Sequence, residues 1–209
     1  MTDTSQPSAR AELRAAVGAM IQRLRRDGAA PGIEIGEHAP DFTLPDAHGQ
    51  PVALRDHLRA GPVVVSFYRG AWCPICNSEL GELTAALPRI TELGARLVAI
   101  SPQGPDASQQ LVQRLGLGFD VLSDVDQSTI RAYRLQFTLD DDLKRIYRDI
   151  GMALDEHNAD ASWDLPVPAT FVLDAAGIVR ARHVDPNYRE RMPVDDIVAA
   201  LEAIRQIVL

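Results

Sequence analysis

Apolar and polar positions along this chain follow two periods, and each period predicts a different kind of element. Val63 to Phe67 is a nearly continuous apolar run typical of a buried strand, whereas Asn77 to Leu93 places its apolar residues at helical spacing. Arg96 to Ser101 indicates a second buried strand. The same patterns predict helices over residues 108–115, 127–133, 140–154 and 194–209, a strand over 119–122, and a hairpin of 169–173 with 178–183. This order implies an α/β fold with a mixed central sheet flanked by helices on both faces.

The N-terminal part of the chain predicts an amphipathic helix outside this alternation. From Ala9 to Asp27 the apolar residues fall on one helical face, and Gly28 follows as a stop signal. We therefore divide the chain into a helical extension, residues 1–30, and a main domain, residues 31–209, with an insertion at about 138–163. The apolar face must be covered by the body of the chain or by a second subunit in a homodimer, and the sequence leaves both open.

Composition and charge exclude several classes of function. The 209 residues carry a net charge of -8, which disfavours nucleic acid and anionic membranes as partners. The longest apolar runs fall well short of the about 20 residues that a membrane helix needs. Only two cysteines occur, and the polar start lacks the apolar core of a signal peptide. We expect a soluble protein in the reducing cytoplasm.

Both cysteines lie in one short run that directly follows the first buried strand. The residue before a proline avoids the α region and proline is favoured at the first helical position, so Cys73 falls at the N-cap and Pro74 begins the helix. A thiolate at that point accepts backbone N–H groups and lies at the positive end of the helix dipole, which lowers its pKa below about 8.5. Cys76 follows one turn later, close enough for a disulfide if the Cβ atoms approach to roughly 4 Å. The CxxC run is a candidate redox dithiol.

Two other interpretations of the cysteines have less support. In the first interpretation, both cysteine side chains serve only as small buried hydrophobic groups. A structural zinc site, the second, normally needs four ligands, and the chain has no second cysteine pair and only five scattered histidines. We accordingly expect neither a metal nor a cofactor.

Several short motifs, in their order and spacing, resemble the peroxiredoxin-like branch of the thioredoxin superfamily, the group of alkyl hydroperoxide reductase and thiol-specific antioxidant proteins. The resemblance covers about residues 35–204 and implies a thioredoxin-like fold. The matching pieces are Gly36 to Leu44, Val64 to Cys76, Val98 to Ser101, Leu122 to Asp124, Tyr133, and Thr170 to Asp174 with Gly177.

The active-site run departs from the Pro-x-x-x-Thr-x-x-Cys motif of peroxiredoxins. Aligned from Tyr68, the motif's peroxidatic cysteine falls at Cys76, its threonine at Cys73 and its proline at Arg69. Glu79 matches the family's glutamate, whereas the second arginine would fall at Pro168. The residue at 168 is instead similar to the cis-proline of thioredoxins, which would present neighbouring backbone groups to an extended substrate chain by strand addition.

Three supporting residues each have two interpretations. In one interpretation, Arg69 supplies a cation near the thiolates or near a bound peroxide. In the other, it is a solvated loop residue. Trp72 forms a flat surface for partner docking, as tryptophan does in thioredoxin, or it only packs. Glu79 takes the family role, or it is an acid favoured by the helix dipole, which is the plainer interpretation.

The resemblance and the dithiol together predict a thiol-based antioxidant oxidoreductase that reduces hydroperoxides and cycles to a Cys73–Cys76 disulfide. A thioredoxin-like protein or a low-molecular-weight thiol would reduce it again. The alternatives are a protein thiol-disulfide oxidoreductase without peroxidase activity and a non-catalytic redox-sensing interaction protein. The order of attack stays open, because the N-cap position favours Cys73 and the family alignment favours Cys76 for peroxide.

Overall fold

The computed structural model describes residues 5–208 and contains a five-stranded mixed sheet in the order β5-β4-β3-β8-β9. The central strand β3 runs parallel to β4 and antiparallel to β8, with Val65 opposite Val98 and Phe171. Most positions of the central strands are buried on both faces, which explains their apolar runs without alternation. The strands are β3 (Val63–Phe67), β4 (Arg96–Ser101), β5 (Asp120–Ser123), β8 (Ala169–Leu173) and β9 (Val179–Val184).

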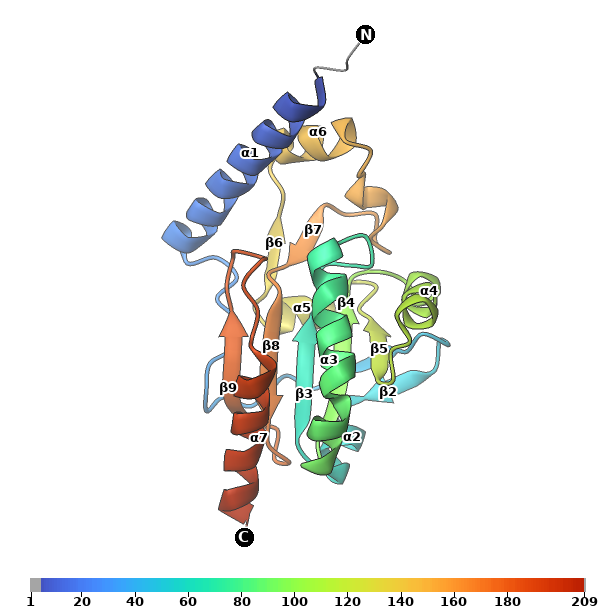
Figure 1. Ribbon diagram of the computed structural model, residues 1–209, viewed down its shortest axis with the longest axis vertical. Coiled ribbons are helices and arrows are strands. Elements are labelled where there is room, and N and C mark those ends of the chain that lie inside the picture. The colour runs from blue at the N-terminus through green and yellow to red at the C-terminus, as the bar shows by residue number, and fades with distance from the viewer. Residues whose placement is uncertain (1–4, 209) are drawn as a thin grey trace.

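Helices cover both faces of the sheet, so the predicted mixed α/β architecture of the thioredoxin-like class is confirmed. In Figure 1, α3 and α7 lie side by side on the near face, and α4 lies beside them. Two apolar clusters, one on each face, form the core of the domain. The covering elements are α3 (Pro74–Glu92), α4 (Pro105–Leu115), α7 (Val194–Val208), α2 (Leu54–Ala60), α5 (Ser128–Ala132), and the hairpin of β1 (Thr43–Pro45) and β2 (Pro51–Ala53).

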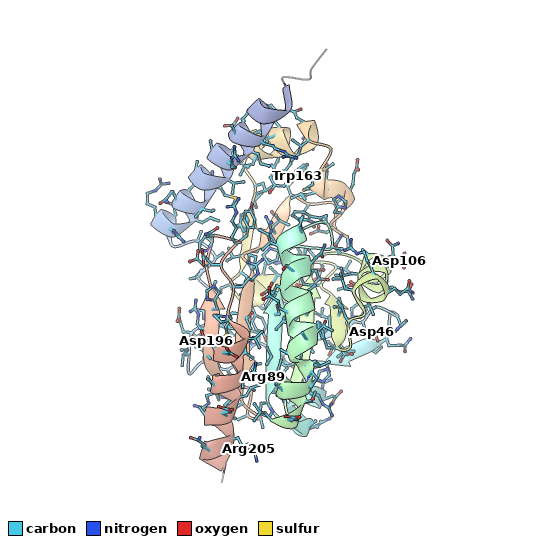
Figure 2. All side chains as sticks on the ribbon, in the orientation of Figure 1. Asp46, Arg89, Asp106, Trp163, Asp196 and Arg205 are labelled. Atoms are coloured by element: carbon cyan, nitrogen blue, oxygen red, sulfur yellow. The ribbon has the colours of Figure 1, made fainter. Side chains whose placement is uncertain are left out.

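The N-terminal helix α1 (Ser5–Asp27) packs on the insertion, forming a cap above the N-terminal end of α3 (Figure 1). We define the cap as α1 together with residues 138–163, which include α6 (Asp141–Asp149) and the 3₁₀ turn Leu154–Glu156. Figure 2 shows Trp163 within it, at the end of the molecule opposite Arg205. The apolar face of α1 forms part of a third core cluster. In this cluster Val17, Met20 and Leu24 of α1 are grouped with Leu143 and Tyr147 of α6.

Apolar packing contributes more than ion pairs to holding α1 on residues 138–163. Ion pairs join Arg23 to Asp140 and Arg145 to Glu12, but all four side chains are more than a third exposed, so each pair contributes little. The face of α1 that the sequence left open therefore lies against the chain's own insertion. The homodimer, the division at residue 30 and the assignment of residues 138–163 as an insertion stay predictions.

Some elements differ from the sequence expectation. The helix expected over 140–154 ends at Asp149, because Gly151 adopts a φ of 77° and a separate 3₁₀ turn follows. The short strands β6 (Gln136–Thr138) and β7 (Asp164–Pro166) were not predicted, and they pair with each other below the cap. No helix within residues 5–208 is long and apolar enough to cross a membrane.

The expected cis peptide bond at Pro168 is wrong, since residues 5–208 contain no cis peptide. Pro168 is buried between β7 and β8, and the preceding N–H, that of Val167, donates a 2.8 Å hydrogen bond to the carbonyl of Leu135. The backbone expected to receive a substrate strand is thus occupied by the chain's own β6 segment.

Candidate active site

The loop between β3 and α3 places the dithiol at the end of the sheet beneath the cap. Gly70 has a φ of 143°, and a Cβ there would lie 2.5 Å from Nε1 of Trp72, so a larger residue would displace the indole. The N–H of Cys73 then donates to the carbonyl of Gly70, which closes a tight turn. Cys73 is the N-cap of α3 and Pro74 its first residue, as predicted.

The two sulfur atoms are in contact as free thiols. Their separation is 2.9 Å, compared with about 2.05 Å in a disulfide. Cys73 Sγ accepts hydrogen bonds from the thiol of Cys76, from the backbone N–H of Cys76 and from Nη2 of Arg69 at 3.0 Å. Both side chains are fully buried, so a substrate reaches them only when the covering residues move.

These contacts separate the acidities of the two thiols. The hydrogen bond from Cys76, with the charge of Arg69 and the N-cap N–H, lowers the pKa of Cys73 to about 5 although burial opposes the shift. The same hydrogen bond, together with burial, raises the pKa of Cys76 well above its usual value. In the reduced state near neutral pH, Cys73 is the thiolate and Cys76 is the proton donor to it.

Arg69 is a buried part of the site rather than a solvated loop residue. Its guanidinium carbon lies 3.7 Å from the ring centre of Tyr188 and 5.1 Å from that of Trp72. Two aromatic side chains therefore hold the cation against the Cys73 sulfur. Sequence reasoning missed Tyr188, because it lies in a polar run more than 100 residues after the dithiol with no motif to mark it.

Arg191 is the second arginine of the site, and the sequence did not identify it. Its Nε donates a 2.6 Å hydrogen bond to Glu79, and its Nη2 lies 3.6 Å from Cys76 Sγ. Burial raises the pKa of Glu79 to about 7 while Arg191 opposes the shift. Glu79 is thus a buried ion-pair partner, not merely an acid near a helix dipole. The match of Glu79 to the family's glutamate was the only sequence signal for Arg191, because a buried carboxylate needs a cationic or hydrogen-bonding partner.

Trp72 is partly exposed and faces the insertion as well as the dithiol loop. Its ring stacks on His157 with centroids 6.3 Å apart and planes at 28°. The same indole borders a surface pocket between the dithiol loop and α4. The structure thus gives Trp72 both packing contacts and an exposed edge.

The model of the AhpC/TSA family matches residues 35–182. The chain belongs to this family. Proteins of similar sequence include a "Putative peroxiredoxin" of Mycobacterium tuberculosis, 38% identical over 98 residues, which are 47% of this chain and 62% of that protein. The thiol-disulfide oxidoreductase ResA of Bacillus anthracis is 30% identical over 57% of this chain and 71% of its own.

Solved structures share the fold. Peroxidoxin BcpB from Mycobacterium tuberculosis superposes with a TM-score of 0.65 at 23% identity, over 82% of this chain and 98% of that one. The match to the mycobacterial sequence relative spans 62% of that protein's length. Family membership and fold are therefore established.

Proposed function

We propose that this AhpC/TSA-family protein is a thiol peroxidase in which Cys73 attacks the hydroperoxide and Cys76 resolves the product. The observation that carries the proposal is the Cys73 sulfur, which accepts three hydrogen bonds and has a thiol 2.9 Å away. A low thiol pKa provides the nucleophile at neutral pH, and a neighbouring thiol provides immediate capture.

The reaction balances in two steps. The Cys73 thiolate attacks the terminal oxygen of the hydroperoxide and the O–O bond breaks. The leaving alkoxide or hydroxide takes a proton from solvent and departs as the alcohol or water, and Cys73 becomes a sulfenic acid. The Cys76 sulfur then attacks the Cys73 sulfur, water leaves, and the Cys73–Cys76 disulfide forms. Arg69 stabilises the thiolate and Arg191 faces the sulfur of Cys76, so each sulfur has a cation within 3.6 Å.

Two features favour a hydroperoxide over a protein disulfide as the substrate. Both sulfurs are fully buried, and a small oxidant needs less displacement of the cover than a folded protein does. The strand-addition surface is also occupied, because β6 pairs with β7 and Leu135 accepts the N–H of Val167. An extended substrate chain would have to displace this segment before it could bind in thioredoxin fashion.

Protein thiol-disulfide exchange is the second candidate function. It is favoured by the thioredoxin-style CxxC with an acidic first cysteine, and by the similarity to ResA, named a thiol-disulfide oxidoreductase. Either function needs electrons from a thioredoxin-like protein or a low-molecular-weight thiol. The reducing cytoplasm is the compartment that fits such a donor.

The test compares the two substrates directly. Hydrogen peroxide consumption and insulin reduction are measured with dithiothreitol as donor, for the wild type, Cys73→Ser and Cys76→Ser. We expect peroxide turnover that is abolished in Cys73→Ser, with insulin reduced no faster than without enzyme. Insulin reduction without peroxide turnover would establish the second candidate instead, and the absence of both would contradict an enzymatic role.

A further inference from the structure

A pocket of about 310 Å³ opens directly beside the dithiol loop, and the proposed peroxidase cycle gives it no role. It lies between the dithiol loop, the outer face of α4 and the insertion. Pockets of this size accommodate small molecules rather than protein segments. We call it the Arg114 pocket, and its walls include Ala71, Trp72, Gln103, Gln110, Arg114 and His157.

The Arg114 pocket is electropositive in a strongly acidic protein. Within the described residues its walls contain the cation of Arg114 and no carboxylate, whereas the chain as a whole carries a net charge of -8. Nη2 of Arg114 donates to the carbonyl of Ala71 at 3.2 Å, which directs the guanidinium toward the dithiol loop. The other N–H groups of a guanidinium can bind a carboxylate, for which its planar geometry is suited.

The position of the pocket links it to the reacting sulfur. Ala71 and Trp72 directly precede Cys73, and two residues span at most about 7 Å. A bound molecule of several atoms can therefore extend from Arg114 to the Cys73 sulfur once Trp72 moves. Gln103 is buried and its Oε1 accepts the N–H of Ala71, so this wall is held in place independently of Arg114.

We propose that the Arg114 pocket binds the electron donor, a low-molecular-weight thiol that carries a carboxylate. This inference rests on the proposed function, since it describes how the Cys73–Cys76 disulfide is reduced. The donor thiolate attacks the Cys73 sulfur, the disulfide breaks, and Cys76 leaves as a thiolate beside Arg191. A second donor thiolate attacks the donor sulfur of the mixed disulfide and releases the Cys73 thiolate. Two donor thiols are oxidised to one disulfide, and their two protons pass to Cys76 and to solvent.

The test measures reduction of the preformed disulfide, so that it does not depend on peroxide chemistry. Protein oxidised with diamide is mixed with glutathione, which carries carboxylates, or with 2-mercaptoethanol, which carries none, and the loss of the disulfide is followed by quenched thiol labelling. Wild type, Arg114→Gln, Arg114→Lys and Arg131→Gln, an exposed arginine on α5, are compared. For each thiol, the rate of disulfide loss in a variant is divided by the rate in the wild type, so the intrinsic nucleophilicity of the thiol cancels from the ratio.

We expect Arg114→Gln to slow reduction by glutathione about fivefold to tenfold, as loss of a charge-assisted contact does, with the 2-mercaptoethanol rate unchanged. Arg114→Lys should restore part of the glutathione rate, and Arg131→Gln should change neither. Equal slowing with both thiols would show that Arg114 acts only through the loop, and an unchanged glutathione rate would show that the pocket binds no such donor. Either result overturns the inference, whereas failure to consume peroxide would instead contradict the proposed function.

Discussion

Two arginines from distant parts of the chain each face one sulfur of the dithiol. Arg69 precedes the CxxC by four residues and contacts Cys73, while Arg191 precedes the last helix and contacts Cys76. In this arrangement the resting thiolate and the resolving sulfur can both be stabilised as anions, at different stages of the cycle. The asymmetry in pKa follows from the single proton shared between the sulfurs and from the closer approach of Arg69.

Replacing Arg69 by Met should raise the pKa of Cys73, because the principal cation beside the thiolate is lost. With a pKa of about 5, the wild-type thiol is ionised above that pH, and its alkylation by iodoacetamide should be nearly independent of pH from about 6 to 8. We expect the Arg69→Met rate at pH 6 to fall about tenfold or more and to rise with pH. Arg131→Gln serves as control, and a flat profile in Arg69→Met would contradict the role given to Arg69.

Replacing Arg191 by Met should destabilise the protein by about 1–2 kcal/mol at pH 8, because Glu79, whose pKa is about 7, loses the cation that stabilises its charge and must take up a proton. The double variant Glu79→Gln with Arg191→Met should recover most of this loss. The folded-state pKa of Glu79 is raised, so its ionisation opposes folding, and the loss in Arg191→Met should shrink as the pH falls toward 5. Urea unfolding at pH 5 and pH 8 measures both effects; a loss independent of pH would show that the pair acts only by packing.

Among the helices and strands, the sequence predicted those whose signal lies in adjacent residues. The run Val63 to Phe67 and the Cys73-Pro74 helix start are encoded by adjacent residues, and both occur as predicted. The β6–β7 pair has only three residues per strand, too few for alternation to indicate a strand, and its pairing depends on partners distant in sequence. Tyr188 and Arg191 were missed for the same reason, since only the folded chain brings them to the dithiol.

The cap should contribute to stability as an integral part of the fold. Met20 is buried between α1 and the insertion, so Met20→Ala removes apolar contacts and leaves a cavity. We expect a loss of about 2–4 kcal/mol in the free energy of unfolding. Arg14→Ala, on the exposed face of the same helix, should change it by less than about 0.5 kcal/mol. Chemical denaturation of both variants is the measurement, and equal, small losses would mean that α1 is not held by its apolar face.

For the molecule as a whole, the sheet, the near-face helices and the cap enclose the dithiol completely. The Cys73 loop lies at the end of the sheet, Arg191 comes from the segment before α7, and the cap covers the N-terminal end of α3 (Figure 1). Access, and not only sulfur reactivity, should therefore govern which oxidant is used.

The enclosed site predicts discrimination by the size of the hydroperoxide. Stopped-flow measurement of the native, reduced protein should give second-order rate constants that decrease from hydrogen peroxide to tert-butyl and cumene hydroperoxide. Protein unfolded in urea supplies the reference, because its thiols are open to all three oxidants. The same relative rates in the native and unfolded states would contradict control by access.

The central claim is that Cys73 is oxidised first and Cys76 resolves it, and intact-mass spectrometry tests this most directly. Each reduced variant receives one equivalent of hydrogen peroxide and is quenched within its first turnover. Cys76→Ser should gain about 16 Da, the mass of a sulfenic oxygen on Cys73, and the wild type should lose about 2 Da as the disulfide forms. Cys73→Ser should remain unmodified on this timescale. Oxidation of Cys73→Ser at the wild-type rate, with Cys76→Ser unchanged, would contradict the account by assigning the attack to Cys76.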